Sequence, residues 1–563
     1  MSMIDARRHQ FFPVLTSSQL AVVKRFASSG EQRFAAGEPV FNIGSAAPVW
    51  VILEGSIDLI RRDGLGREEP ITTQSAGQFT GEVSQLAGRP ALALGKAGKD
   101  GCLAFALDPA HLRALLIGSA EIGEIVMRAL ILRRVGLIEG GVAGSVLLGK
   151  PGEANLVRLQ GFLGRNGYPQ TLINAGDPSE GRAIVERLGI APEDLPVLVC
   201  PTGTVLKCPS NAEAALCLGM TPTLDPDRIY DVAVVGAGPA GLATAVYAAS
   251  EGLSVLVLDA RAIGGQAGAS SRIENYLGFP TGISGQALAG RAYNQAQKFG
   301  AELAIPTEVT ALKCNYPSFG YHSLDLSTGD PVQARTVVVA SGARYRRPQI
   351  KNLEFFEGSG VSYWASPVEA KLCEGEEVIL VGGGNSAGQA AVFLASRVKR
   401  LHLVVRGNGL AASMSRYLID RISALENVEL HTRTEVTEIT GAADGGLTCA
   451  VLKNRESGAV WTQTLRHLFL FVGADPNTGW LTDCVELDAK GFVTTGETRG
   501  ETGGRTASLE TSRSGVFAIG DVRAGSTKRV AAAVGEGAAV VAQIHAHLSA
   551  HPADAVLPYV RRA

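Results

Sequence analysis

The fold class that the sequence predicts is a multidomain α/β protein with two copies of a strand–glycine turn–helix unit. Apolar runs at 231–235 and 377–381 each lead into a glycine-rich turn and then into a segment of helical character. The chain has 563 residues, too many for one hydrophobic core, so three or four domains are expected. Its 68 glycines cluster at such turns, which favours nucleotide-binding architecture over low complexity.

The first turn, 236–241, has the spacing of a dinucleotide-binding fingerprint. Gly236 allows a tight turn out of the strand, Gly238 lets the backbone approach a pyrophosphate, and Gly241 lets the helix pack close to the strand. A second apolar run ends at Asp259, where a carboxylate accepts hydrogen bonds from a ribose. The unit therefore predicts a Rossmann-like domain. Its site residues are Gly236, Gly238, Pro239, Ala240, Gly241 and Asp259.

A membrane span is the alternative for residues 232–250, which are long, apolar and uncharged. We reject it because the glycines stand where a phosphate-binding turn needs them and a strand with an acid follows. Residues 1–13 lack the apolar core of a signal peptide, so a cytoplasmic protein is expected. The net charge of -2 gives no reason to expect a nucleic acid or an anionic membrane as a partner.

Two segments after the first unit carry a family resemblance. Residues 264–266, GGQ, and 273–280, IENYLGFP, resemble the FAD-binding part of the thioredoxin reductases, and the resemblance extends from about residue 229 to the C-terminus. It implies FAD at the first glycine turn and a homodimer. It places Gln266 and Asn275 at the flavin, Asp521 at the ribityl chain and Arg529 beside the isoalloxazine at a helix start. Further positions of the implied FAD site are Gly264, Gly265, Ala340, Gly342, Gly520, Val530 and Ala531.

The second glycine turn, 382–387, indicates a second dinucleotide-binding domain. Segments 340–342 and 471–477 flank it and look like the crossovers by which this domain is inserted into the first. The expected FAD-binding domain is therefore split into 229–345 and 475–563, with an NAD(P)H-binding domain at 346–474. Residues of the second site are Gly382, Gly384, Asn385, Ser386, Ala387 and Arg406.

Arg406 favours NADPH over NADH. It ends the second strand of this unit, where a carboxylate would repel a 2′-phosphate and an arginine forms a charge-assisted pair with it. Thioredoxin reductases carry a cluster of three arginines here, and Gly407 and Ala411 fill the other two positions. Arg416 and Arg421, from the next expected helix, are candidate substitutes.

The redox-active C-x-x-C of the thioredoxin reductases is missing. In the matching segment, residues 361–367, Trp364 and Pro367 stand where the family has its two cysteines. Dithiol exchange needs a thiolate at both places, so we expect no dithiol relay, and Cys373 nearby is single. None of the 8 cysteines forms a C-x-x-C pair, and we interpret them mostly as buried small side chains.

Residues 1–140 are expected to form a β-roll with a trailing helix over 108–139. The pattern resembles a cyclic-nucleotide-binding domain, with its phosphate-binding cassette at 79–90. Glu82 fits the residue that holds the ribose, but the position of the phosphate-binding arginine is Ala91, and Arg89 comes two places early. We therefore predict weak binding of cyclic AMP, and either another ligand or a docking role for this domain.

Residues 141–220 are expected to have the order βαβαββα, which resembles a thioredoxin or glutaredoxin fold with Pro196 at the family's cis-proline position. The active cysteines should follow the first strand, and 149–153 contains none. A Cys200–Cys208 pair is unlikely, because the hairpin register places Cys200 opposite Thr204 and Cys208 opposite Pro196. A polar linker, 219–228, leads into the flavoprotein.

Two functions of different class follow. The first is an oxidoreductase that passes electrons from NADPH through FAD to a quinone, ferredoxin, flavin, dioxygen or partner protein, but not through a dithiol relay. The alternative is a regulatory or redox-sensing flavoprotein scaffold whose N-terminal domain senses a ligand. The sequence indicates no metal site and assigns no catalytic residue.

Overall fold

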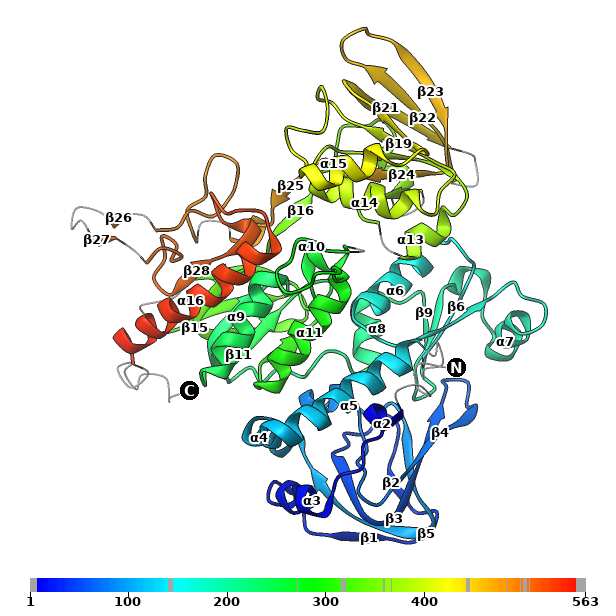
Figure 1. Cartoon of the computed structure of the whole chain (residues 1–563), viewed down its shortest axis with the longest axis vertical. Coiled ribbons are helices and arrows are strands. Elements are labelled where there is room, and N and C mark those ends of the chain that lie inside the picture. Colours follow the sequence, from blue (N-terminus) through cyan, green and yellow to red (C-terminus); the bar gives the residue numbers. More distant parts are fainter. Residues whose placement is uncertain are drawn as a thin grey trace.

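The computed structural model describes residues 8–139, 145–270, 272–314, 320–357, 360–365, 367–441, 446–481, 484–496, 498–499, 504–505 and 507–552. Four large sheets follow one another along the chain, and the multidomain α/β fold class is confirmed. In Figure 1 the first sheet lies at the bottom, the second at the right, the third in the centre and the inserted unit at the top. Among the described residues, no helix is long and apolar enough to cross a membrane.

The N-terminal part is a β-roll whose strands have the order β1-β5-β3-β4, with β2 also paired to β5. The predicted single helix over 108–139 is wrong, because Asp108 caps one helix and the chain breaks at Ser119 before a second begins. The strands are β1 Gln32–Phe34, β2 Pro39–Phe41, β3 Val49–Arg62, β4 Glu68–Ser75 and β5 Leu94–Leu107. The helices are α2 Arg8–Phe11, α3 Ser17–Lys24, η1 Val83–Ala87, α4 Pro109–Gly118 and α5 Ala120–Glu139.

The next unit has the predicted βαβαββα order. Its sheet has the order β7-β6-β8-β9, with β6 and β7 parallel and the other pairs antiparallel. The Leu195–Pro196 peptide bond is cis, and Cys200 lies opposite Thr204 as predicted. The elements are β6 Val146–Gly149, α6 Ala154–Arg165, β7 Thr171–Asn174, α7 Gly181–Leu188, η2 Pro192–Asp194, β8 Val197–Val199, β9 Val205–Lys207 and α8 Asn211–Cys217.

The central sheet has the order β12-β11-β10-β15-β14-β13, with β28 paired to β15. Strands β12, β11, β10, β15 and β28 are parallel, so their carboxyl ends and the glycine turn lie at one edge. Helices α9, α11 and α16 supply small and branched apolar side chains to one core on this sheet. The elements are β10 Ile229–Val235, α9 Pro239–Ser250, β11 Val255–Leu258, α10 Gly265–Gly268, α11 Gly285–Lys298, β12 Glu302–Ala304, β13 Val309–Lys313, β14 His322–Leu326, β15 Gly329–Val339, η3 Gly479–Leu481, β26 Thr498–Arg499, β27 Gly504–Arg505, β28 Val516–Ala518, η4 Gly520–Val522 and α16 Val530–Ala550.

The inserted unit has a parallel sheet of order β17-β24-β18-β19-β20 and a separate antiparallel sheet, β21-β22-β23. Its two connections to the central unit lie side by side, because β16 pairs with β25. The elements are β16 Ala343–Tyr345, α12 Leu353–Phe356, β17 Val361–Ser362, α13 Pro367–Leu372, β18 Glu377–Val381, α14 Asn385–Ala395, β19 Arg400–Val404, α15 Arg416–Ser423, β20 Val428–His431, β21 Thr434–Gly441, β22 Leu447–Asn454, β23 Val460–Thr464, β24 His467–Leu470 and β25 Ala474–Pro476.

Candidate functional site

The first glycine turn leaves an open cradle at the start of α9. Gly236 has a φ of +115°, and a Cβ built there would lie 2.2 Å from the carbonyl oxygen of Ala340, so only glycine fits. A Cβ on Gly238 meets nothing within 4 Å. Packing of the protein therefore does not require a glycine at position 238. The backbone of Gly238 faces free space, where a pyrophosphate would lie.

The N-termini of α9 and α14 lack the side-chain caps that other helices of the chain have. Thr16, Asp108, Ser210 and Ser284 each cap a helix with a side-chain oxygen. The N-cap residues of α9 and α14 are Gly238 and Gly384, which offer no such oxygen. Uncapped N–H groups at a helix start bind anions. Both starts therefore fit the phosphates of a dinucleotide.

Asp259 holds the first turn together. Its Oδ2 accepts the backbone N–H of Ala237 at 2.8 Å, and its Oδ1 accepts those of Arg261 at 2.8 Å and Ala262 at 3.1 Å. The carboxylate thus joins the glycine turn to the loop that leads into α10. It stands at the end of β11, as predicted, and is half-buried.

The structure brings several predicted FAD-site residues to this turn. Gly264 and Gly265 have φ values of 87° and 54°, and a Cβ on Gly265 would lie 3.1 Å from the Cα of Gly238. Gln266 donates to the carbonyl of Ala343, at the crossover to the inserted unit. The carbonyl of Gly342 accepts the N–H of Asn477 at 3.0 Å, which joins the two crossovers.

The Gly520–Asp521 turn reaches the same edge from β28. A Cβ on Gly520 would lie 3.0 Å from the Cβ of Ala240 in α9. Burial raises the pKa of Asp521, while the ammonium of Lys528 opposes that shift. Glu536 accepts the N–H of Gly520 at 2.6 Å and also pairs with Arg523.

Other predicted positions lie at element ends or on the surface. Arg529 is the N-cap residue of α16, and Val530 and Ala531 open that helix, as the resemblance implied. Asn275 is exposed. Its neighbour Glu274 pairs with Arg421 of the inserted unit.

The second glycine turn repeats the geometry of the first. Gly382 has a φ of +147°, and a Cβ there would lie 2.5 Å from the carbonyl oxygen of Phe471. A Cβ on Gly384 meets nothing within 4 Å. Asn385 accepts the N–H of Ser415 at 2.7 Å, while Ser386 is exposed and Ala387 packs in the core of the inserted unit.

The other arginines considered around Arg406 each pair with a carboxylate. Arg406 is exposed after β19. Arg421 is committed to Glu274, and Arg416 pairs with Asp420 at 2.9 Å. Arg433, which the sequence did not single out, donates its backbone N–H to Gly407 at 2.9 Å and its Nε to Asn408 at 2.9 Å. A second guanidinium therefore lies beside the loop of Arg406, although it also pairs with Glu456.

Trp364 and Pro367 stand at the start of α13. The indole Nε1 of Trp364 donates to Glu369 of α13 at 2.8 Å, which holds the half-buried ring against that helix. Pro367 is exposed as the first residue of α13. Cys373 is fully buried, and burial raises the pKa of its thiol to about 11. Its thiolate is therefore scarce at neutral pH.

The interpretation of the cysteines as mostly buried small side chains did not include the disulfides that four of them form. The structure pairs Cys200 with Cys217 and Cys314 with Cys484, with Cα atoms 6.4 and 6.1 Å apart. The partners are distant in sequence and meet only through the tertiary fold, so no spacing rule could find them. The prediction that Cys200 does not pair with Cys208 is confirmed, and Cys208 is free and exposed.

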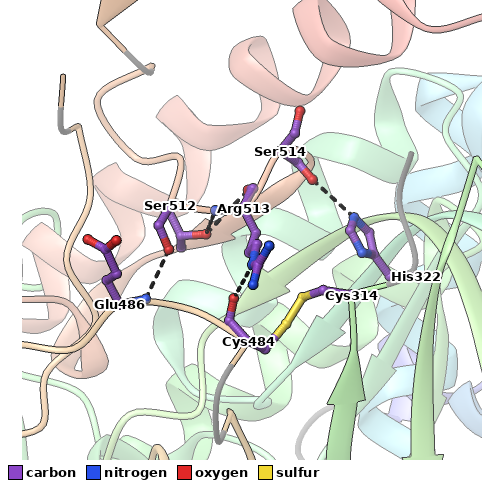
Figure 2. The surroundings of a disulfide bond; sticks show 8 residues. Cys314, His322, Cys484, Glu486, Ser512, Arg513 and Ser514 are labelled. Atoms are coloured by element: carbon purple, nitrogen blue, oxygen red, sulfur yellow. Dashed lines mark hydrogen bonds between the residues drawn. A yellow bond between two sulfur atoms is a disulfide. The ribbon is translucent and has the colours of Figure 1, made fainter. Parts of the chain in front are cut away.

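Figure 2 shows the surroundings of the Cys314–Cys484 disulfide. Strand register places Cys314 level with His322, which pairs with Ala334 next to Tyr230, at the start of β10. The turn follows Val235, five residues further on, which is roughly 17 Å along a strand. Arg513 donates to the Cys484 carbonyl at 2.6 Å and His322 lies 3.2 Å from the Ser514 carbonyl, so this end of the sheet forms a separate structural cluster.

A further residue near the first turn comes from the second unit of the chain. Arg165, at the end of α6, donates its Nη2 to the carbonyl of Gly265 at 3.2 Å. Burial lowers its pKa, while Tyr345 and Asp259 oppose that shift. No sequence pattern signals this contact, because it depends on how two domains dock. Residues 264–266 thus contact both Arg165 of the second unit and Ala343 at the crossover to the inserted unit.

Two uncapped glycine turns, each at the end of a parallel strand and one of them in a unit inserted into the other, have the geometry expected of two dinucleotide sites. A family model described as pyridine nucleotide-disulphide oxidoreductase matches residues 230–537. The chain belongs to this family. It is a thioredoxin reductase-like, FAD-dependent NAD(P)H oxidoreductase, and the cofactors of its class are FAD and NADPH. A second model, described as cyclic nucleotide-binding domain, matches residues 31–118.

Individual proteins show the same likeness. A thioredoxin reductase of Peptoclostridium litorale is 30% identical over 333 residues, covering 57% of this chain and 98% of that protein. An NADPH-dependent thioredoxin reductase 3 of Arabidopsis thaliana is 31% identical over 314 residues, but the match spans only 56% of that protein and 55% of this chain. The crystal structure of Lactococcus lactis thioredoxin reductase (FR conformation) matches 57% of this chain with 26% identity and a TM-score of 0.52.

Proposed function

We propose that the chain transfers electrons from NADPH through FAD to an acceptor that is not reduced by a dithiol relay. The observation that carries the proposal is the pair Trp364 and Pro367 at the two positions of the family's redox cysteines. When bound, the two cofactors supply the hydride and electron chemistry. The residues of the chain bind and orient them.

The FAD-binding residues fit the group, because Gly238 offers an open cradle at an uncapped helix start. In our proposal α9 receives the pyrophosphate, and Asp259 fixes the turn and faces the ribose. Asp521 and the start of α16 form the remaining side of the proposed FAD site. The complete proposed set comprises Gly236, Gly238, Pro239, Ala240, Gly241, Asp259, Gly264, Gly265, Gln266, Asn275, Ala340, Gly342, Gly520, Asp521, Arg529, Val530 and Ala531.

Three further candidates for the missing pair are poorly suited to replace it. Cys373 is buried with a raised pKa, Cys200 is fully buried, and the Cys314–Cys484 disulfide lies at the opposite end of the central sheet. Electrons would therefore leave the flavin directly, to a quinone, ferredoxin, free flavin, dioxygen or a partner protein. Steady-state NADPH oxidation with a panel of these acceptors tests the proposal, and failure with all of them would favour the alternative.

That alternative is a regulatory flavoprotein whose N-terminal domains sense a ligand. A chain of contacts favours it. Arg134 in α5 donates to the Gly167 carbonyl at 3.0 Å, and next to Gly167 the side chain of Asn166 donates to the Arg261 carbonyl at 3.2 Å. We interpret residues 141–220 as a thioredoxin-like domain without active cysteines, placed between the sensor domain, 1–140, and the flavoprotein. A homodimer is part of the proposal, and sedimentation measures it.

NADPH is expected to reduce the flavin faster than NADH, because Arg406 pairs with the 2′-phosphate. Loss of a charge-assisted contact costs about 1.5–3 kcal/mol. Arg406→Ala should therefore lower the second-order rate constant for flavin reduction by NADPH roughly 10- to 150-fold. NADH should be nearly unaffected. Stopped-flow flavin reduction with both nucleotides measures this.

Arg416→Ala is the matched control for Arg406→Ala. Arg416 is exposed and already paired with Asp420, so its removal should leave the NADPH preference unchanged. Equal rates with NADPH and NADH in the unmodified protein would show that Arg406 has another role. A preference that survives Arg406→Ala but not Arg433→Ala would transfer the role to Arg433.

A further inference from the structure

The N-terminal domain contains a cavity of about 260 Å³ between the β-roll and α5. Gly81 and Glu82 of the cyclic-nucleotide cassette lie at one side of it. Most of the wall is apolar. Among the side chains that form it are Phe12, Phe41, Leu59, Ile71, Leu92 and Leu137.

One cation lies buried in this wall. Arg133 of α5 donates its Nε to the Phe11 carbonyl at 2.8 Å and its Nη1 to the carbonyls of Phe79 and Gly81 at 2.9 Å each. Its guanidinium also lies 4.7 Å from the ring centre of Phe79. Within the described part of the chain, Nη2 is buried and has no hydrogen-bond partner. Burial lowers the pKa of Arg133 to about 9, so the group is still a cation at neutral pH.

The cassette residues are not arranged for a cyclic nucleotide. The carboxylate of Glu82 accepts the N–H of Ser84 at 3.0 Å and lies 3.6 Å from Arg134, so it is already occupied. Arg89 does not line the cavity. Its guanidinium donates to the Met220 carbonyl and, at 3.0 Å, to the hydroxyl of Tyr293 in α11. The cavity wall has Ala91 where a phosphate-binding arginine would stand.

We propose that this cavity binds an amphipathic carboxylate, with its apolar body against the cavity wall and its carboxylate directed at the guanidinium of Arg133. An unpaired buried charge is unfavourable, and an anionic ligand satisfies it. The second arginine in the wall, Arg61, already pairs with Glu69. A buried guanidinium in a mostly apolar cavity suits a carboxylate on a hydrocarbon chain better than a nucleotide, which presents several polar groups.

Calorimetry on the full-length holoprotein tests the proposal with decanoate as the probe. Decanoate should bind one per chain, and decanol, which lacks the charge, should bind at least tenfold more weakly. Cyclic AMP should bind more weakly than decanoate. No decanoate binding, equal binding of decanol, or tighter binding of cyclic AMP would each overturn the proposal.

Two variants place the ligand in this cavity. Ile71→Glu adds a negative charge at a wall residue that is 38% exposed, so the fold should tolerate it and decanoate binding should be lost. Ile117→Glu is the matched control, because Ile117 is 56% exposed on α4 and does not line the cavity. Arg133→Lys keeps a charge but not the planar donor set, and should weaken decanoate more than decanol. Unchanged binding in Ile71→Glu would place the ligand elsewhere.

A separate cluster in the inserted unit has the geometry of a metal site. His402 of β19 lies opposite Glu429 of β20, and His431 follows two residues later on the same face. Nδ1 of His402 lies 3.1 Å from Nε2 of His431 and 3.5 Å from a carboxylate oxygen of Glu429. Nε2 of His431 lies 3.5 Å from the other oxygen of Glu429.

From these distances we infer a site for Zn²⁺ or a similar divalent cation. Tetrahedral bonds of about 2.0–2.1 Å place ligand atoms roughly 3.3 Å apart. The two imidazole nitrogens are close to this spacing, and each lies 3.5 Å from a different oxygen of Glu429. The other ring nitrogen of His402 faces a carboxylate oxygen of Glu377 at 3.7 Å. A carboxylate behind a histidine ligand is the usual support of a zinc site. A water molecule would complete the tetrahedron.

Zinc titration of chelator-treated full-length protein, read with a chromophoric chelator, tests this second proposal without any flavin readout. One Zn²⁺ per chain is expected. His431→Gln and Glu429→Gln should abolish tight binding, and Glu377→Gln should weaken it about 10- to 100-fold. Glu426→Gln, an exposed acid just before β20, is the control. Zinc binding that is equal in the unmodified protein and His431→Gln would overturn the site.

Discussion

Replacement of Gly238 by valine is expected to give a folded protein that purifies without flavin and stays colourless when FAD is added. A Cβ at this position meets nothing within 4 Å, and the residue's φ of -73° is open to any residue. The folded structure should therefore tolerate the valine. The added side chain would fill the space where a pyrophosphate approaches the start of α9. Absorbance of the purified protein and its circular dichroism measure the two effects separately.

Two further glycine variants make this result specific. Gly384→Val changes the matching position of the second unit, where a Cβ also meets nothing within 4 Å, so the protein should stay yellow but lose reduction by NADPH. Gly236→Ala should instead destabilise the fold, because its Cβ would lie 2.2 Å from the Ala340 carbonyl oxygen. A yellow Gly238→Val protein with normal flavin content would place the FAD elsewhere.

The nucleotide units could be predicted from the sequence because their constraints are local. Gly236 and Gly382 need a positive φ beside a neighbouring backbone, and each turn lies between a buried strand and a helix of small residues. The paired crossovers β16 and β25 were also recognisable, since both flank the second turn. Such features depend on residues that are close together in the chain.

Features that depend on domain docking were not predictable in this way. Arg165 contacts Gly265, which is 100 positions away in the sequence. Arg421 pairs with Glu274 because of where the inserted unit is placed. The Cys314–Cys484 pair spans 170 positions, with the whole inserted unit between its two residues. The break of the 108–139 helix at Ser119 was missed because apolar spacing continues through it.

Reduction of a protein disulfide such as oxidised thioredoxin by NADPH is expected to stay at background. A dithiol relay needs a thiolate nucleophile and a resolving thiol close to the flavin. Trp364 and Pro367 supply neither, and the indole of Trp364 is held by Glu369 at 2.8 Å. With a small-molecule acceptor the same preparation should consume NADPH, which shows that the cofactors are functional.

Cysteine variants test whether any thiol of the chain contributes to reduction of a protein disulfide. Cys373→Ala and Cys208→Ala remove free thiols of the chain, and neither should change NADPH oxidation with a small acceptor. Cys314→Ala together with Cys484→Ala removes the disulfide that register places roughly 17 Å along the strand from the glycine turn. Thioredoxin turnover that is lost in this double variant would make that disulfide a relay and would require a large movement of the central unit. Robust turnover that survives all of these variants would contradict the proposed electron route, because no thiol near the flavin would remain to carry it.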